Sequence, residues 1–149
     1  MTYFSFGRKM LYLSSILDLF NGEIVTYSIA DKQDTAFMLD ILSQLPNLLG
    51  TVLHSDQGSV YTSQAYQEAV KGRGISTSRK GTPADNAPIE SFHSTLKSET
   101  FYLEPLTIIM TAIVVQVVRD YMSYYNSIRI QTKLNNQSPV HFRQLVIRT

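Results

Sequence analysis

The chain has 149 residues, of which 44% are hydrophobic and 17% charged, and its formal net charge is +1. This length is typical of one domain, and the composition excludes a disordered segment because it supplies enough apolar side chains for a core. The sequence contains no cysteine, which excludes disulfide bonds, thiolate nucleophiles and cysteine zinc sites. The longest apolar stretch, 106–118, is too short to cross a bilayer. Because the opening residues also lack a signal-peptide pattern, we expect a cytoplasmic protein with no membrane partner.

Two segments that favour strands open the chain. Residues 10–18 and 23–29 are rich in apolar and β-favouring side chains. Between them, Asn21 and Gly22 form a pair that tolerates positive φ and favours a tight hairpin turn. We therefore expect two or three antiparallel strands at the start of the domain.

Helix and strand signals alternate after this hairpin. Start and stop residues bound four short apolar segments: a helix capped by Asp31 or Asp34 and ended by Pro46, a buried strand at 51–54, a helix from Ser63 to Gly72, and an edge strand at 75–78. Residues 79–88 are predicted to form a loop because they are rich in Gly, Pro, Asp and Asn. Further helices are expected from about Pro88, over 107–125, and after Ser138–Pro139. This order predicts a mixed α/β sheet flanked by helices.

Two acidic residues stand in settings that favour a site. Asp56 follows the apolar strand 51–54, and the carboxyl ends of strands in an open α/β sheet face the ligand crevice. Glu90 is expected in the first turn of a helix, and Lys97 lies two turns later on the same face. Two carboxylates can hold Mg²⁺ or Mn²⁺, and the lysine can meet a DNA phosphate. On residue types alone, the alternative of a solvated charged surface is the more common one.

Longer motifs around these residues resemble the DDE catalytic core of bacterial insertion-sequence transposases, in the retroviral-integrase superfamily. The matching segments follow the family's order along the chain: LDLF at 17–20, HSDQGSVYTS at 54–63, SRKG at 78–81, DNAPIESF at 85–92, LKSE at 96–99, YYN at 124–126, Arg129, and LNNQSP at 134–139. The resemblance covers nearly the whole chain. It implies one integrase-like core domain over 1–149 with an RNase H-like fold, and no helix-turn-helix domain is expected in this sequence.

The resemblance also implies a function and the residues that perform it. The function is DNA transposition, in which strands are cut at transposon ends and joined to target DNA with Mg²⁺ or Mn²⁺, by a homo-oligomer in the bacterial cytoplasm. The implied site residues form three groups: the catalytic and metal-binding acids Asp56 and Glu90, the DNA-binding residues Lys97, Arg79 and Lys80, and the supporting residues His54 and Asn86, which are not expected to be ligands.

Two departures from the family pattern affect the expected activity. The family's first acid belongs to a Thr-Asp-x-Thr-Tyr pattern on the first strand, and residues 1–3 match only the end of this pattern. That aspartate would stand immediately before Met1, so we expect a truncated first strand and an impaired active site. Asp18 is expected to be structural, because it matches a different family position. The 33 residues between Asp56 and Glu90 are fewer than the family's usual spacing, which is expected to shift the loop rather than the acids.

Two other functions stay open at this point. One is a non-catalytic DNA-binding or oligomerisation remnant of a truncated transposase. The other is a metal-dependent nuclease built on the same fold, which a strand-transfer assay would separate from a transposase.

The other histidines and the late tyrosines have simpler interpretations. His93 is expected at the surface or in support of the site, and His141 is expected to be exposed. Tyr121, Tyr124 and Tyr125 could stack on bases, but their helical spacing more often indicates a core or an interface.

Overall fold

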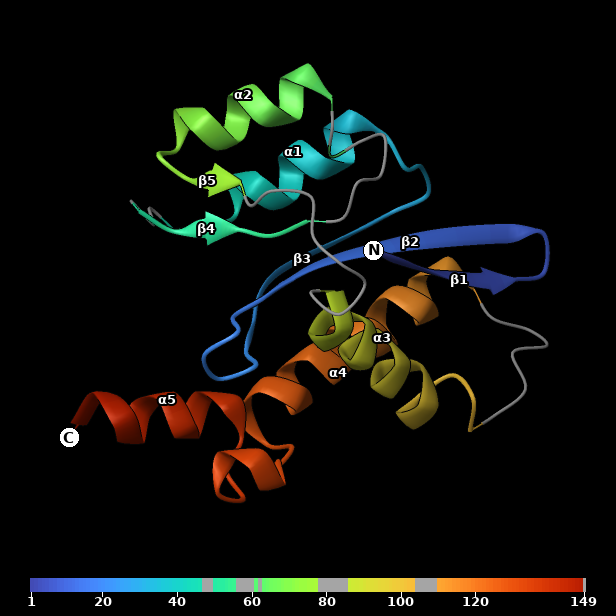
Figure 1. The fold of residues 1–149 in the computed structure, drawn as a ribbon. Coiled ribbons are helices and arrows are strands. Elements are labelled where there is room, and N and C mark those ends of the chain that lie inside the picture. Colours follow the sequence, from blue (N-terminus) through green and yellow to red (C-terminus); the bar gives the residue numbers. More distant parts are fainter. Residues whose placement is uncertain (47–49, 56–60, 62, 78–85, 104–109, 149) are drawn as a thin grey trace.

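The computed structural model describes residues 1–46, 50–55, 61, 63–77, 86–103 and 110–148. Its elements, shown in Figure 1, are in chain order β1 (Thr2–Phe6), β2 (Lys9–Leu17), β3 (Ile24–Ala30), α1 (Thr35–Ser43), β4 (Val52–Leu53), α2 (Gln64–Gly72), β5 (Ser76–Thr77), α3 (Ala87–Glu99), α4 (Thr111–Ser127), the 3-10 helix η2 (Thr132–Leu134) and α5 (Pro139–Arg148). None of the helices described is both long and apolar enough to pass through a membrane.

β1, β2 and β3 form an antiparallel sheet in that order, as the sequence predicts. Phe4 pairs with Leu11 across β1 and β2, and Leu13 pairs with Ile29 across β2 and β3. Side chains alternate between the two faces of a strand. Phe4, Leu11 and Leu13 therefore share one face, while Tyr12 lies on the other.

The connection between β2 and β3 differs from the predicted two-residue turn. Gly22 has a φ of 74°, but Asn21 does not have positive φ. The backbone amide of Asp18 donates to the carbonyl of Glu23 at 2.8 Å, so residues 19–22 form the connection. The Asn21 side chain is buried, and its amide donates to the carbonyl of Pro139 at 3.1 Å. This contact between distant parts of the chain stabilises the longer connection.

Polar side chains begin α1 and α2 as predicted. The carboxylate of Asp34 accepts a hydrogen bond from the amide of Phe37 at 3.0 Å, and the hydroxyl of Ser63 accepts one from the amide of Tyr66 at 3.3 Å. Each cap satisfies a backbone donor that has no partner within the helix, which contributes about 1 kcal/mol. Of the two predicted caps for α1, Asp34 is the one the structure uses.

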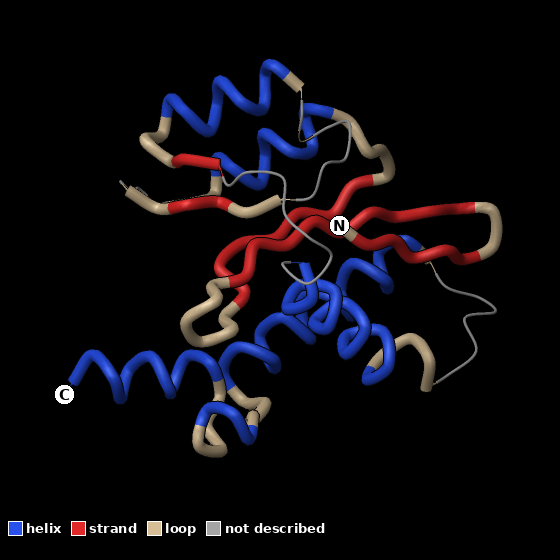
Figure 2. Tube along the Cα trace, viewed as in Figure 1, coloured by secondary structure: helices blue, strands red, loops and turns tan. Residues whose placement is uncertain are grey.

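β4 and β5 form a short parallel pair, with Val52 opposite Ser76. The prediction of an edge strand near 75–78 is confirmed, but β4 is not buried as predicted, because Val52 is 61% exposed. Among the described residues, no ladder of hydrogen bonds joins this pair to β1–β3. The expected mixed sheet is thus present as an antiparallel sheet and a separate parallel pair (Figure 2).

Helices cover both faces of the antiparallel sheet, as Figure 1 shows. On one face, α3 and α4 complete a core whose buried members are Phe4, Phe6, Leu11, Leu13, Ile24, Phe92, Leu96, Phe101, Val114, Val118, Tyr121, Met122 and Tyr125. On the other face, α1 and α2 complete a second core, formed by Phe37, Met38, Leu42, Leu45, Tyr66, Val70 and Ile75. The predicted architecture of a sheet flanked by helices is therefore confirmed.

The last helices largely follow the sequence prediction. α4 begins at Thr111, within the predicted range, and 107–109 lie outside the described residues. α5 begins at Pro139 as predicted and extends away from the rest of the chain (Figure 1). An ion pair at 2.8 Å between Arg143 of α5 and Glu23 holds the helix beside the start of β3.

Candidate functional site

Helix α3 carries the predicted acid Glu90 in its first turn. Pro88 lies in the first turn of the helix, where a backbone amide has no hydrogen-bond partner within the helix. The lack of an amide hydrogen in proline therefore costs no hydrogen bond there. Phe92 and Leu96, one turn apart, are buried against the sheet, and Glu90 is left exposed. The positive end of the helix dipole favours a carboxylate at this position. The prediction that Glu90 lies in the first turn of a helix is confirmed.

His93 lies one turn after Glu90 and is buried. Of its two expected places, at the surface or in support of the site, the first is therefore wrong. Its Nε2 atom is 3.4 Å from the hydroxyl oxygen of Ser15 on β2. Burial lowers the pKa of His93 to about 3, with smaller contributions from the positive charges of the N-terminal amine and Lys97. The ring is therefore neutral near pH 7, and it joins α3 to the sheet directly beside the turn that carries Glu90.

Lys97 lies two turns after Glu90 and reaches across the edge of the sheet to β1. Its Nζ atom is 5.1 Å from the centre of the Tyr3 ring and 5.6 Å from that of Phe4. Both distances allow a cation–π interaction. Partial burial lowers the pKa of Lys97. The ammonium group therefore lies beside β1, at the end of α3 away from Glu90.

Only part of the predicted site falls within the described residues. Three of its members lie outside them: Asp56, Arg79 and Lys80. The binding of one metal site by both Asp56 and Glu90 thus stays a prediction. His54 follows β4 and is partly buried, and Asn86 precedes α3 without forming a side-chain capping bond.

The donor set proposed for a metal consists of carboxylates, which suit a hard divalent cation. Within the described ranges, no three His, Asp or Glu residues lie close enough to hold one. Of the two predicted ligands, Glu90 is exposed and Asp56 lies outside these ranges. Asp18 accepts a hydrogen bond at 2.8 Å from the amide of Phe20, two residues later in the β2–β3 connection, which agrees with its expected structural role.

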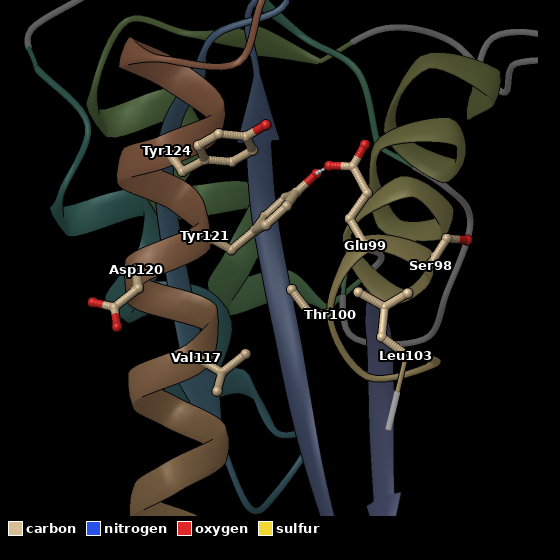
Figure 3. A pocket seen from close by; sticks show the side chains of 8 residues that line it. All are labelled: Ser98, Glu99, Thr100, Leu103, Val117, Asp120, Tyr121 and Tyr124. Carbon is tan, nitrogen blue, oxygen red and sulfur yellow. Dashed lines mark hydrogen bonds between the residues drawn. The ribbon is translucent and has the colours of Figure 1, made fainter. Parts of the chain in front are cut away.

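A hollow of about 590 Å³ lies between the end of α3 and the middle of α4 (Figure 3). The sequence analysis did not predict it, although Glu99 and Arg129 both belong to the matching motifs. Glu99 accepts a hydrogen bond from the hydroxyl of Tyr121 at 2.6 Å and pairs with Arg129 at 2.7 Å. These bonds lower the pKa of Glu99, the larger effect coming from Arg129. Because this carboxylate is already engaged, the hollow is a weaker candidate for metal chemistry than the start of α3.

The tyrosines of α4 mainly belong to the core, as expected. Tyr121 and Tyr125 are buried, while Tyr124 is 41% exposed. His141 is exposed, which also agrees with the sequence.

Comparison with known families identifies the fold around this site. Two models described as the integrase core domain match residues 1–83 and 90–147. The chain belongs to the integrase core domain family. Among curated integrase-core relatives, the chain is 40% identical over 148 residues to InsK of the insertion sequence element IS150 of Escherichia coli (strain K12), covering 95% of this chain and 52% of InsK. It is 34% identical to the transposase of IS904 from Lactococcus lactis, covering 97% of this chain and 59% of that protein.

A transposase-like protein of Haemophilus influenzae is 38% identical and is covered over 67% of its length. This chain thus spans about half to two thirds of the length of these relatives. It is a member of the insertion-sequence transposases of the integrase superfamily.

Solved structures confirm the RNase H-like fold. The catalytic core of HTLV-2 integrase, solved with magnesium in a trimeric form, superposes with a TM-score of 0.74 at 16% identity and covers 95% of this chain and 90% of that one. The core domain of BIV integrase gives a TM-score of 0.70 at 15% identity, over 99% of this chain and 93% of that one. At such low identity these matches establish the fold alone.

Proposed function

We propose that residues 1–149 are the DDE catalytic core of an insertion-sequence transposase, which cuts DNA at transposon ends and joins them to target DNA. The observation that carries the proposal is membership of the integrase core domain family together with Glu90 and Lys97 on the same helix, α3. The chain spans about half of its relative from IS150, so the activity of a whole transposase is part of the proposal.

In this proposal, Asp56 and Glu90 bind Mg²⁺ or Mn²⁺. The bound ions would supply activation of the attacking oxygen and stabilisation of the leaving oxygen. Lys97, with Arg79 and Lys80, which precede α3 in the sequence, would hold DNA phosphates. His54 and Asn86 would support the ligands without binding metal.

The register of the sheet supports a place for the family's first acid. Thr2 pairs with Leu13, so a residue immediately before Met1 in a continued strand would stand opposite Ser15. Alternation puts that residue on the face of Thr2, which is the face covered by α3. Ser15 contacts His93 on this face, one turn after Glu90. An aspartate added there would therefore point toward the helix that carries the proposed third acid.

We also propose that the chain works as a homo-oligomer on DNA. The HTLV-2 integrase core, which shares the fold, was solved in dimeric and trimeric forms. In this chain the outer side of α4 exposes Ile113, which leaves apolar surface for such a contact.

Nicking of a supercoiled plasmid in Mn²⁺ tests the proposed chemistry. The proteins are the chain as it stands, the chain extended by Thr-Asp before Met1, and this extended chain with Glu90→Gln. Glu68→Gln in the extended chain is the matched control, because Glu68 is an exposed glutamate on α2 that bonds to Gln64 at 2.7 Å. We expect nicking by the extended chain and by its Glu68→Gln variant, and background levels with Glu90→Gln.

Each other outcome contradicts a defined part of the proposal. If the extended Glu90→Gln protein still nicks DNA, Glu90 is not the third acid. If the chain as it stands already nicks DNA and Glu90→Gln stops it, another residue supplies the first acid, and Asp18 and Asp85 would be mutated next. DNA binding without nicking by any of the proteins would favour the non-catalytic remnant.

A further inference from the structure

Tyr3 presents an aromatic ring at the edge of the sheet beside the proposed site. It lies on β1, which pairs only with β2 among the described strands. Tyr3 is 54% exposed, while the neighbouring Phe4 is 4% exposed and belongs to the core. The exposed part of the Tyr3 ring therefore leaves surface for a ligand.

Lys97 places a positive charge beside this ring. Its Nζ atom lies 5.1 Å from the centre of the Tyr3 ring and 5.6 Å from that of the buried Phe4. These two contacts place the ammonium group at the edge of β1. An exposed aromatic ring and an ammonium group thus lie side by side.

We propose that Tyr3 and Lys97 together bind one nucleotide of single-stranded DNA. The Lys97 ammonium takes the backbone phosphate, and the Tyr3 ring stacks on the adjacent base. A cation beside an exposed aromatic ring suits this ligand, because every base has a π face and every nucleotide carries a phosphate. The inference rests on the proposed function, and it adds a base-stacking residue, Tyr3, that the sequence analysis did not single out.

The spacing along α3 places this nucleotide relative to the proposed reaction. Lys97 follows Glu90 by seven residues, which corresponds to about 10 Å of helix. One step of a DNA strand advances about 3.4 Å in a duplex and more when the strand is extended. The stacked base is therefore two or three nucleotides from the phosphate held near Glu90. A base must leave the duplex to stack on Tyr3, so the pair favours an unpaired or frayed end.

A structural role for the pair would give a different result. If Lys97 only covered the edge of β1, removing the Tyr3 ring would change the stability of the protein. It would not change the preference for DNA with bases over DNA without them. The test therefore compares two ligands with the same phosphates, of which one has bases and the other has none.

Fluorescence anisotropy with two labelled probes makes this comparison: a six-nucleotide oligo-dT and an abasic backbone of the same length. We expect the chain to bind oligo-dT at least about fivefold more tightly than the abasic probe, as one stacked base contributes at least that much. Tyr3→Leu should remove this preference and Tyr3→Phe should keep it. Tyr124→Leu, which removes a 41% exposed tyrosine from α4, is the matched control and should also keep it.

The second variant separates charge from stacking. Lys97→Met should weaken both probes equally and reduce the slope of log affinity against log salt by about 0.7, the value for one phosphate contact on a single strand. Equal binding of the two probes by the unchanged chain, or a Tyr3→Leu protein that keeps the preference, would overturn the inference alone. Failure to bind either probe would overturn the proposed function as well.

Discussion

The imidazole of His93 is held neutral inside the contact between α3 and the sheet. Its ring packs beside Phe92, with 5.6 Å between the ring centres, and its Nε2 atom lies 3.4 Å from the hydroxyl of Ser15. Burial is the main reason that its pKa falls from 6.5 to about 3, followed by the N-terminal amine and Lys97. Protonation of His93 is therefore unfavourable in the folded protein, whereas in the unfolded chain the imidazole has its usual pKa of 6.5.

This difference predicts that acid destabilises the protein through His93. Between pH 6.5 and about pH 3 the unfolded chain binds a proton that the fold excludes, so the free energy of unfolding falls as the pH falls. The expected loss is roughly 2 kcal/mol between pH 7 and pH 5. Urea unfolding at these two pH values measures it. His93→Gln keeps a hydrogen-bonding group near Ser15 but does not titrate, so its loss should be smaller. Equal losses in both proteins would show that His93 is not the group responsible.

Between elements, Asn126 joins the end of α4 to the start of β3. Its side-chain oxygen accepts a hydrogen bond from the amide of Ile24, and its side-chain nitrogen donates to the carbonyl of Ile24, both at 2.9 Å. Asn126→Ala leaves both backbone groups without these partners, and we expect it to lower the free energy of unfolding by about 1–3 kcal/mol. Denaturant unfolding tests this against Ser123→Ala, an exposed change on the same helix that should cost less than about 0.5 kcal/mol. A similar small effect of both changes would mean that this pair of bonds adds little.

The sequence predicted elements well where their signals are local. Asp34 and Ser63 cap their helices through residues only three positions away, and a local rule is enough to find them. The connection near Asn21 was predicted wrongly because its conformation depends on the carbonyl of Pro139, 118 residues away. Asn126 appeared only as part of a motif, and its bonds to Ile24 became visible when the chain was folded.

In the candidate site, too, local features were predicted and features that depend on distant residues were missed. The helical period was enough to place Glu90 and Lys97 on one helix, and the structure agrees. The burial of His93 was missed because it depends on Ser15, which is 78 residues away. Tyr3 was noticed only as the end of a family pattern, since its contact with Lys97 requires the sheet and α3 to be packed together.

At the scale of the whole molecule, the antiparallel sheet connects two cores that each support part of the proposed metal site. On β2, Leu13 faces the core beneath α3, and its neighbour Tyr12 packs against the core beneath α1 and α2. Glu90 is carried by α3 on the first side, whereas Leu53 of β4, three residues before Asp56, packs on the second. A metal ion shared by the two acids would therefore connect segments that pack on opposite faces of the sheet.

This arrangement predicts that metal binding stabilises the whole fold once three acids are available. Without metal, an aspartate added before Met1 would increase repulsion among carboxylates, so the extended chain should melt at a lower temperature than the chain as it stands. With Mn²⁺ at about 100 times its dissociation constant, binding should contribute about 2.7 kcal/mol, which raises the melting temperature by roughly 5–10 °C. The chain as it stands should bind Mn²⁺ weakly and change by much less.

Thermal unfolding followed by circular dichroism, with and without Mn²⁺, measures both effects, and EDTA should reverse the increase. In the extended chain, Glu90→Gln should reduce the Mn²⁺ effect to that of the chain as it stands, because one of the three charged ligands is lost. Glu68→Gln should leave the effect unchanged, since Glu68 bonds to Gln64 on α2. An increase of the same size in the Glu90→Gln protein would mean that Mn²⁺ binds elsewhere, and the start of α3 would not be part of the metal site.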